Sequence, residues 1–129
     1  MNNISEITYE QAKTIITDRT LILKPDYTYY AYNRNGTPIS VIAYSVSNNK
    51  IKWHSCYTVP DERNKGTFST LLKEATKICK KMYNYSFLAD CTEYSYRIFE
   101  KNGYTVKAVK PYKNFTIYKM EAYNGETKD

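Results

Sequence analysis

The residues that follow Pro60 have the types and spacing of an anion-binding loop. Two basic residues, Arg63 and Lys65, precede Gly66, where an amphipathic run begins. A glycine lets backbone N–H groups approach an anion closely, and the free amides of a first helical turn lie at the positive end of the helix dipole. Arg63 and Lys65 can add charge-assisted hydrogen bonds to phosphate oxygens. The pattern GxxxxGK[ST] of nucleotide-binding loops is absent, so the segment predicts a phosphate site of another kind.

A strand before this loop and a long helix after it would hold it in place. The strand-like run 50–59 ends at Pro60, and a helix is expected to begin near Lys65 or Gly66. The apolar residues of this helix recur at helical spacing on one face: Phe68, Leu71, Leu72, Ala75, Ile78, Cys79 and Met82.

The remaining segments alternate between strand-like and helix-like patterns. A short helix is predicted over 5–16 with Ser5 as its cap, and a second helix over 92–102 with Thr92 as its cap and Gly103 after its end. The other predicted strands are 27–32, 39–46, 85–89, 104–109 and 114–120. We expect an α+β fold with a mixed, mostly antiparallel sheet flanked by helices. We expect one domain over 1–123, followed by a polar tail over 124–129.

Composition excludes several classes of protein. With 42% hydrophobic and 25% charged residues, the 129-residue chain has the composition of one globular domain. Cys56, Cys79 and Cys91 form no CxxC pair and there is one histidine, so we expect no disulfide framework, no metal site and a reducing, cytoplasmic location. The longest apolar runs are short, so we expect no membrane span. Cys56 is expected to pack in the core. The net charge of +6 attracts anions, either nucleic acid or a small polyanionic cofactor.

Two motifs resemble those of the GNAT superfamily of acyl-CoA N-acyltransferases. That family carries Arg/Gln-x-x-Gly-x-Gly/Ala after a strand ending in Val-x-Pro, and residues 63–67 match without a gap. Phe68 replaces the final small residue, and Thr58 stands where an aliphatic residue is usual. Residues 99–104, Phe-Glu-Lys-Asn-Gly-Tyr, resemble the family's Tyr-Glu-Lys-x-Gly-Phe. The first 45 residues are shorter than the family norm, in which two helices usually flank the substrate.

The resemblance implies acetyl-CoA as cosubstrate and a strand 50–59 that splays from its parallel neighbour 85–89. The pantetheine arm would lie in that gap, and the pyrophosphate on the amides of residues 64–68. Thr92 aligns with the family's cofactor-contacting asparagine, and Phe99 with the tyrosine that protonates the leaving thiolate. The cofactor-binding residues implied in this way are Tyr57, Thr58, Val59, Arg63, Asn64, Lys65, Gly66, Thr67, Phe68, Thr92 and Phe99.

The same resemblance suggests two catalytic residues. His54 lies nine residues before Arg63, a spacing that serotonin N-acetyltransferases share, and its ordinary pKa near 6.5 suits deprotonation of an ammonium. By strand alternation it should share a face with Lys52 and Cys56. Phe99 has no proton to give, so Tyr96, one helical turn earlier, is the candidate acid.

The expected function is transfer of an acetyl group from acetyl-CoA to a primary amine, on a small molecule or on a protein lysine or N-terminus. Two alternatives stay open. Phe68 and Phe99 would suit a degenerate acyl-CoA-binding or protein-interaction module. The net charge of +6 and the fifteen tyrosines would suit a basic nucleic-acid binder or an acyltransferase directed at tRNA or modified bases. The chain could act as a monomer or as a dimer.

Overall fold

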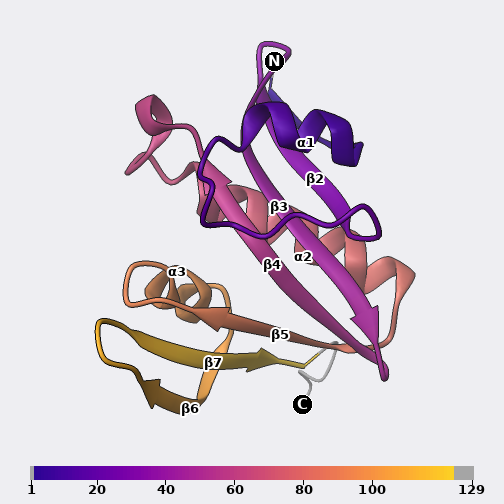
Figure 1. The fold of residues 1–129 in the computed structure, drawn as a ribbon. Coiled ribbons are helices and arrows are strands. Elements are labelled where there is room, and N and C mark those ends of the chain that lie inside the picture. Colours follow the sequence, from indigo (N-terminus) through magenta and orange to yellow (C-terminus); the bar gives the residue numbers. More distant parts are fainter. Residues whose placement is uncertain (1, 124–129) are drawn as a thin grey trace.

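Seven strands form one sheet in the order β1-β2-β3-β4-β5-β7-β6 (Figure 1). The structure, a computed structural model, describes residues 2–123, so the predicted tail 124–129 lies outside the described residues. The strands are β1 Asn2–Ile7, β2 Thr28–Arg34, β3 Thr37–Ser47, β4 Lys50–Thr58, β5 Ser86–Cys91, β6 Thr105–Pro111 and β7 Thr116–Ala122. The helices are α1 Tyr9–Ile15, the short 3₁₀ turn η1 Pro60–Glu62, α2 Thr67–Met82 and α3 Tyr96–Lys101.

The sheet is antiparallel at every junction except one. β4 and β5 run parallel, and α2 makes the crossover between them that a parallel pair requires. The other five pairings are antiparallel. The prediction of an α+β fold with a mixed, mostly antiparallel sheet is therefore confirmed.

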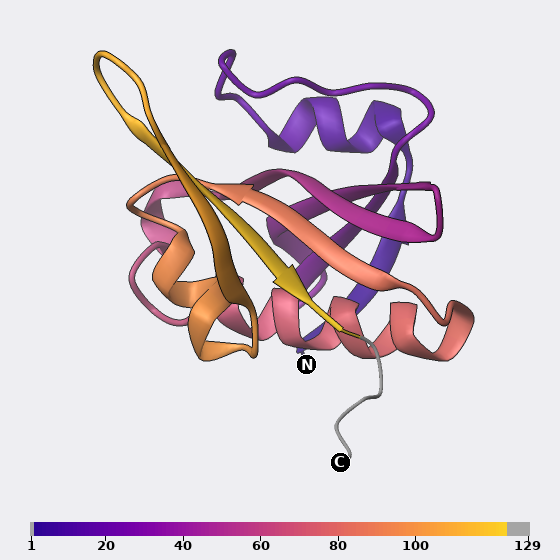
Figure 2. The same ribbon diagram turned by 90° about the horizontal axis from the view of Figure 1, so that it is seen from below.

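Helices cover both faces of the sheet, and each face carries its own hydrophobic core. Figure 2 shows α1 on one face and α2 with α3 on the other. The larger core lies under α2 and includes Trp53, Leu71 and Phe87, all of which are buried. A smaller core lies under α1 and includes Ala12 and Tyr57. The sheet thus separates an α1 side from an α2 side, and both sides matter for the site described below.

The N-terminal segment differs from the prediction of a helix over 5–16. Residues up to Ile7 form β1, which pairs antiparallel with β2 at the edge of the sheet. The helix begins only at Tyr9, and Thr8 rather than Ser5 caps it, in a capping box with Gln11. Pairing with β2 satisfies the backbone groups of this segment, and this non-local interaction overrides the local helical pattern.

The second predicted helix is shorter than expected. α3 begins at Tyr96, and Ser95 is its N-cap residue. Thr92 instead stabilises the preceding turn, since its hydroxyl accepts a hydrogen bond from the amide of Tyr94 at 3.2 Å. α2 and the strands after β1 lie where the sequence predicts them, with ends shifted by a few residues.

Candidate active site

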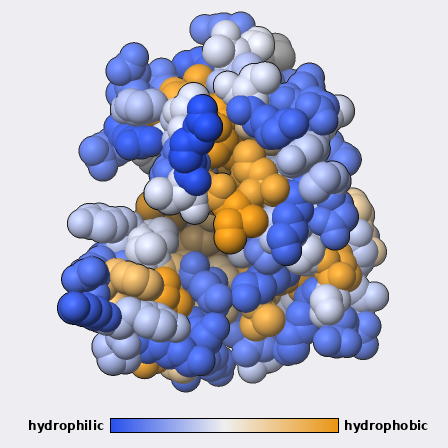
Figure 3. Space-filling view, viewed as in Figure 1, coloured by the Kyte–Doolittle hydropathy of each residue, from blue (hydrophilic) through white to orange (hydrophobic). Residues whose placement is uncertain are grey.

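β4 and β5 diverge and leave a groove between them. The two strands pair only where Lys50–Trp53 runs beside Ser86–Ala89, as the resemblance implied. Beyond Trp53 the edge of β4 that faces β5 has no strand partner within residues 2–123. The groove has a volume of about 1240 Å³ and also receives residues from the loop 17–27, the η1–α2 loop and the β5–α3 loop. Figure 3 shows its mouth as a hollow bordered by hydrophobic surface.

A β-bulge in β4 changes which side chains face the groove. Ser55 and Cys56 together lie opposite a single residue of β3, so the alternation of side chains reverses at this point. Tyr57 therefore joins the α1-side core, whereas Cys56 packs against the α2-side core. Lys52 and His54 share a face, but the prediction that Cys56 shares it with them is wrong. Burial raises the pKa of the Cys56 thiol, which is consistent with a packing role.

The loop before α2 is held by the side chain of Arg63. Its Nε donates a hydrogen bond to the carbonyl oxygen of Thr58 at 2.8 Å, and its guanidinium lies 5.5 Å from the ring centroid of Tyr57. Asn64 and Gly66 both have positive φ angles, of 63° and 77°. Position 66 favours glycine because a positive φ is strained for other residue types. The space around it is open, since no atom lies within 4 Å of the place that a Cβ would take. The backbone here is open to a ligand.

The first turn of α2 offers unsatisfied polar groups to the groove. The first amide that bonds within the helix is that of Thr70, which donates to the carbonyl of Gly66 at 3.1 Å. The amides of residues 67–69 therefore have no helical partner and are available to an anion. The hydroxyl of Thr67 is buried and has no hydrogen-bond partner within residues 2–123. A buried hydroxyl without a partner is unusual in a native protein.

Most of the residues predicted to bind the cofactor line this groove. They are Tyr57, Thr58, Arg63, Asn64, Gly66, Thr67, Phe68, Thr92 and Phe99. Val59 and Lys65 do not line it, and the amide of Val59 is used in a hydrogen bond to Ile39 of β3. The ring of Phe99 is buried and lies 6.0 Å from that of Phe68, so Phe99 closes the groove with an apolar floor.

His54 lies in the groove within a defined set of contacts. Its Nε2 is 2.7 Å from the Ser45 hydroxyl oxygen, and its ring stacks on Tyr27 at a centroid distance of 4.2 Å. Burial lowers the pKa of His54, and the positive charges of Lys52 and Lys24 lower it further. Sequence reasoning missed Ser45 and Tyr27, since only the pairing of β3 with β4 and the course of the loop bring them to His54.

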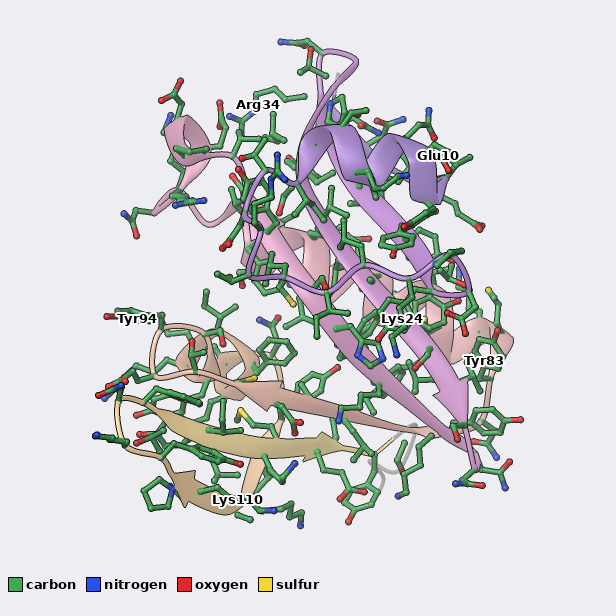
Figure 4. All side chains as sticks on the ribbon, viewed as in Figure 1. Glu10, Lys24, Arg34, Tyr83, Tyr94 and Lys110 are labelled. Carbon is green, nitrogen blue, oxygen red and sulfur yellow. The ribbon has the colours of Figure 1, made fainter. Side chains whose placement is uncertain are left out.

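The structure separates the candidate acid Tyr96 from the groove. Its ring stacks on Tyr118 of β7 at 4.0 Å, and it is not one of the residues that line the groove. Tyr94, two residues earlier, does line the groove and is 88% exposed (Figure 4). The sequence predicted a helix from Thr92, whereas α3 begins at Tyr96, and the tyrosine that reaches the groove is Tyr94.

The described part of the chain carries neither a metal-binding cluster nor a membrane-spanning helix. Residues 2–123 contain no group of three or more histidine, cysteine, aspartate or glutamate side chains placed to hold a metal ion. None of the helices formed by these residues is long and apolar enough to cross a membrane.

Comparison with known proteins places this fold and groove in a family. A model of the acetyltransferase (GNAT) family matches residues 2–104. Among solved structures, the ribosomal-protein-S18-alanine N-acetyltransferase of Escherichia coli is similar at 14% identity and a TM-score of 0.79, over 100% of this chain and 99% of that one. Ard1 from Thermoplasma volcanium is similar at 16% identity and a TM-score of 0.76, over 97% and 100%. The IAA acetyltransferase of Bacillus cereus ATCC 14579 has 12% identity and a TM-score of 0.77, over 95% and 99%.

A search of curated protein sequences gave no match. The solved structures are similar at low identity and show the shared acyl-CoA N-acyltransferase fold, whereas the family model covers most of the chain. The chain therefore belongs to the acetyltransferase (GNAT) family.

Proposed function

We propose that this chain transfers an acetyl group from acetyl-CoA to a primary amine, with both substrates bound at once. The observation that carries the proposal is the continuity of the groove. A free β4 edge, which suits an extended amide-bearing arm, leads directly to the first turn of α2, which suits a pyrophosphate. The hydroxyl of Thr67, which has no hydrogen-bond partner in the described part of the chain, lies at that turn.

The residues present fit acetyl-CoA, which supplies an activated acyl thioester when bound. The hydroxyl of Thr67, a residue that lines the groove, would donate a hydrogen bond to a phosphate oxygen. The open backbone at Gly66 lets the amides of the α2 N-terminus approach the pyrophosphate. Arg63 holds the loop in place through its hydrogen bond to the Thr58 carbonyl, and its guanidinium adds positive charge beside the proposed pyrophosphate site. The backbone amide of Thr58 is the proposed contact to the pantetheine arm, because the carbonyls of Tyr57 and Thr58 already accept hydrogen bonds from Ser40 and Arg63.

His54 is the proposed base. Because its pKa is lowered, the imidazole stays neutral through the neutral pH range and can accept a proton from the acceptor ammonium, directly or through water. Tyr27 stacks on the ring and holds its plane. In the tautomer in which Nε2–H donates to the Ser45 hydroxyl, Nδ1 carries the free lone pair and takes up the proton.

Tyr94 replaces Tyr96 as the proposed acid. Phe99 has no ionisable group, and Tyr96 is stacked on Tyr118 outside the groove. Tyr94 carries a phenol at the mouth of the groove, from which it can protonate a departing thiolate directly or through one water.

Calorimetric titration with acetyl-CoA, followed by a thiol-release assay over a panel of amines, tests the proposal. We expect binding with a stoichiometry of one and thiol release that depends on the amine. Failure to bind acetyl-CoA would refute the assignment of the groove.

One observation favours a second function, that of an acyl-CoA-binding module without catalysis. The position expected to hold the acid is the buried ring of Phe99, which is 1% exposed. Tight binding of acetyl-CoA with no thiol release for any amine would favour this second function.

Three free cysteines support our further proposal of a cytoplasmic location.

A further inference from the structure

A second cavity lies beside the groove, on the part of the sheet face that α1 leaves open. Its volume is about 250 Å³, and it shares Lys52, Ala89 and Asp90 with the groove. Figure 2 shows α1 and its loop over one part of this face and the β6–β7 hairpin rising at the other edge. A molecule with one end at His54 can therefore extend its other end into this second cavity.

The second cavity carries an excess of positive charge. Lys52, Lys107 and Lys119 line it, together with the carboxylates of Asp90 and Glu121. Asp90 is shared by Lys52 at 3.1 Å and Lys119 at 3.0 Å, and Glu121 is paired with a lysine of β4 at 3.3 Å. One carboxylate between two ammonium groups leaves one positive charge unbalanced. Lys107 adds another, since it makes no ion pair within residues 2–123.

The acidic residues of the main groove are already engaged. Asp18 accepts two hydrogen bonds from Thr20, which lower the pKa of its carboxyl group. Glu62 is paired with Arg34, and Asp90 with its two lysines. Within residues 2–123, two of the three carboxylates that line the groove are thus ion-paired, and nearby Arg63 partly offsets the charge of the third, Asp18. The groove therefore offers little negative charge to a purely cationic acceptor.

We infer that the acceptor is an amine that also carries an anionic group, a carboxylate or a phosphate, a short chain away. The amine lies at His54, and the anion binds Lys107 and Lys119 in the second cavity through charge-assisted hydrogen bonds. This inference rests on the proposed acetyl transfer for the role of the amine. The charge arrangement that carries it does not depend on catalysis.

Binding to the CoA-saturated protein tests the inference without turnover. Calorimetry compares γ-aminobutyrate with the amino alcohol of the same chain length, and phosphoethanolamine with ethanolamine. We expect the anionic member of a pair to bind roughly fivefold tighter, as one to two partly exposed charge pairs would give. The pair with the larger preference identifies the anion as carboxylate or phosphate.

A charge-reversal variant connects the preference to this cavity. Lys107→Glu should abolish the preference, whereas Lys73→Glu should keep it. Lys73 is exposed on α2, on the opposite side of the sheet, and its substitution changes the net charge equally. Thermal melting checks that each variant folds. If Lys107→Glu does not fold, Lys107→Gln replaces it in the binding comparison.

Two results would overturn the inference: equal or tighter binding of the uncharged amines, or a preference that survives Lys107→Glu. Thiol release is measured separately on the same amines. Its absence for all of them would refute the proposed transfer, while the measured binding preference would still decide this inference.

Discussion

Thr67→Val should make the free protein more stable and its cofactor complex weaker. The hydroxyl of Thr67 is buried and has no hydrogen-bond partner among residues 2–123, and the residue as a whole is 4% exposed. Valine has nearly the same shape, so the substitution removes the unsatisfied group without leaving a cavity. A buried unsatisfied polar group costs about 1–3 kcal/mol. After a small loss from the poorer fit of valine to a helix N-terminus, we expect a gain of about 1 kcal/mol, or roughly 3–5 °C in Tm.

The effect on acetyl-CoA should have the opposite sign. A hydrogen bond to a charged group contributes about 1.5–3 kcal/mol, so its loss should weaken binding roughly tenfold to a hundredfold. Thermal melting without ligand and calorimetric titration with acetyl-CoA measure the two effects on the same protein.

Thr70→Val is the matched control for this experiment. Its hydroxyl is exposed and already bonded to the Gly66 carbonyl at 3.1 Å, so its loss should slightly lower Tm and leave acetyl-CoA affinity unchanged. The reasoning fails if Thr67→Val destabilises the free protein and leaves affinity intact, because the hydroxyl would then have a structural partner.

Three further substitutions test the site. Gly66→Glu should abolish acetyl-CoA binding by charge repulsion at the loop, whereas Gly66→Asn, which tolerates a positive φ, should retain most of it in the same titration. His54→Gln should lower the rate and remove the acidic limb of the pH profile. In the parent protein that limb should lie below pH 6.5, since a lowered pKa keeps the imidazole neutral until the pH falls further. An unchanged profile excludes His54 as the base. Tyr94→Phe should lower kcat roughly a hundredfold, as loss of a general acid does, while Tyr96→Phe should not; the reverse result in the thiol-release assay would restore Tyr96.

The parts of the site that could be predicted from the sequence depend on local signals. Arg63, Gly66 and the apolar face of α2 lie within one short stretch, and the loop and helix they predict are present. That stretch and the second motif around Gly103 indicated the acetyltransferase family, and the strand-helix-strand order over 50–89 indicated the mixed sheet.

The parts that were missed depend on contacts between distant segments. Ser5 is a good cap in isolation, but its segment pairs with β2 and forms β1. Cys56 faces the side of the sheet opposite to the predicted one because of the register shift between β3 and β4. Strand alternation alone cannot reveal such a shift. Tyr94 faces the groove because α3 starts late, and helix boundaries are the least readable feature of a sequence.

The separation of two cores by the sheet has a kinetic consequence. The core under α1 is the smaller, and a loop rather than a second helix continues the layer that α1 begins. Local opening of that layer exposes less apolar surface than opening α2, so it requires less free energy. Amide protons of α1 should accordingly exchange with solvent sooner than those of α2. If the proposed function holds, the α1 side can open locally while α2, the proposed pyrophosphate-binding helix, stays folded. Amines could then enter and leave several times while one cofactor remains bound.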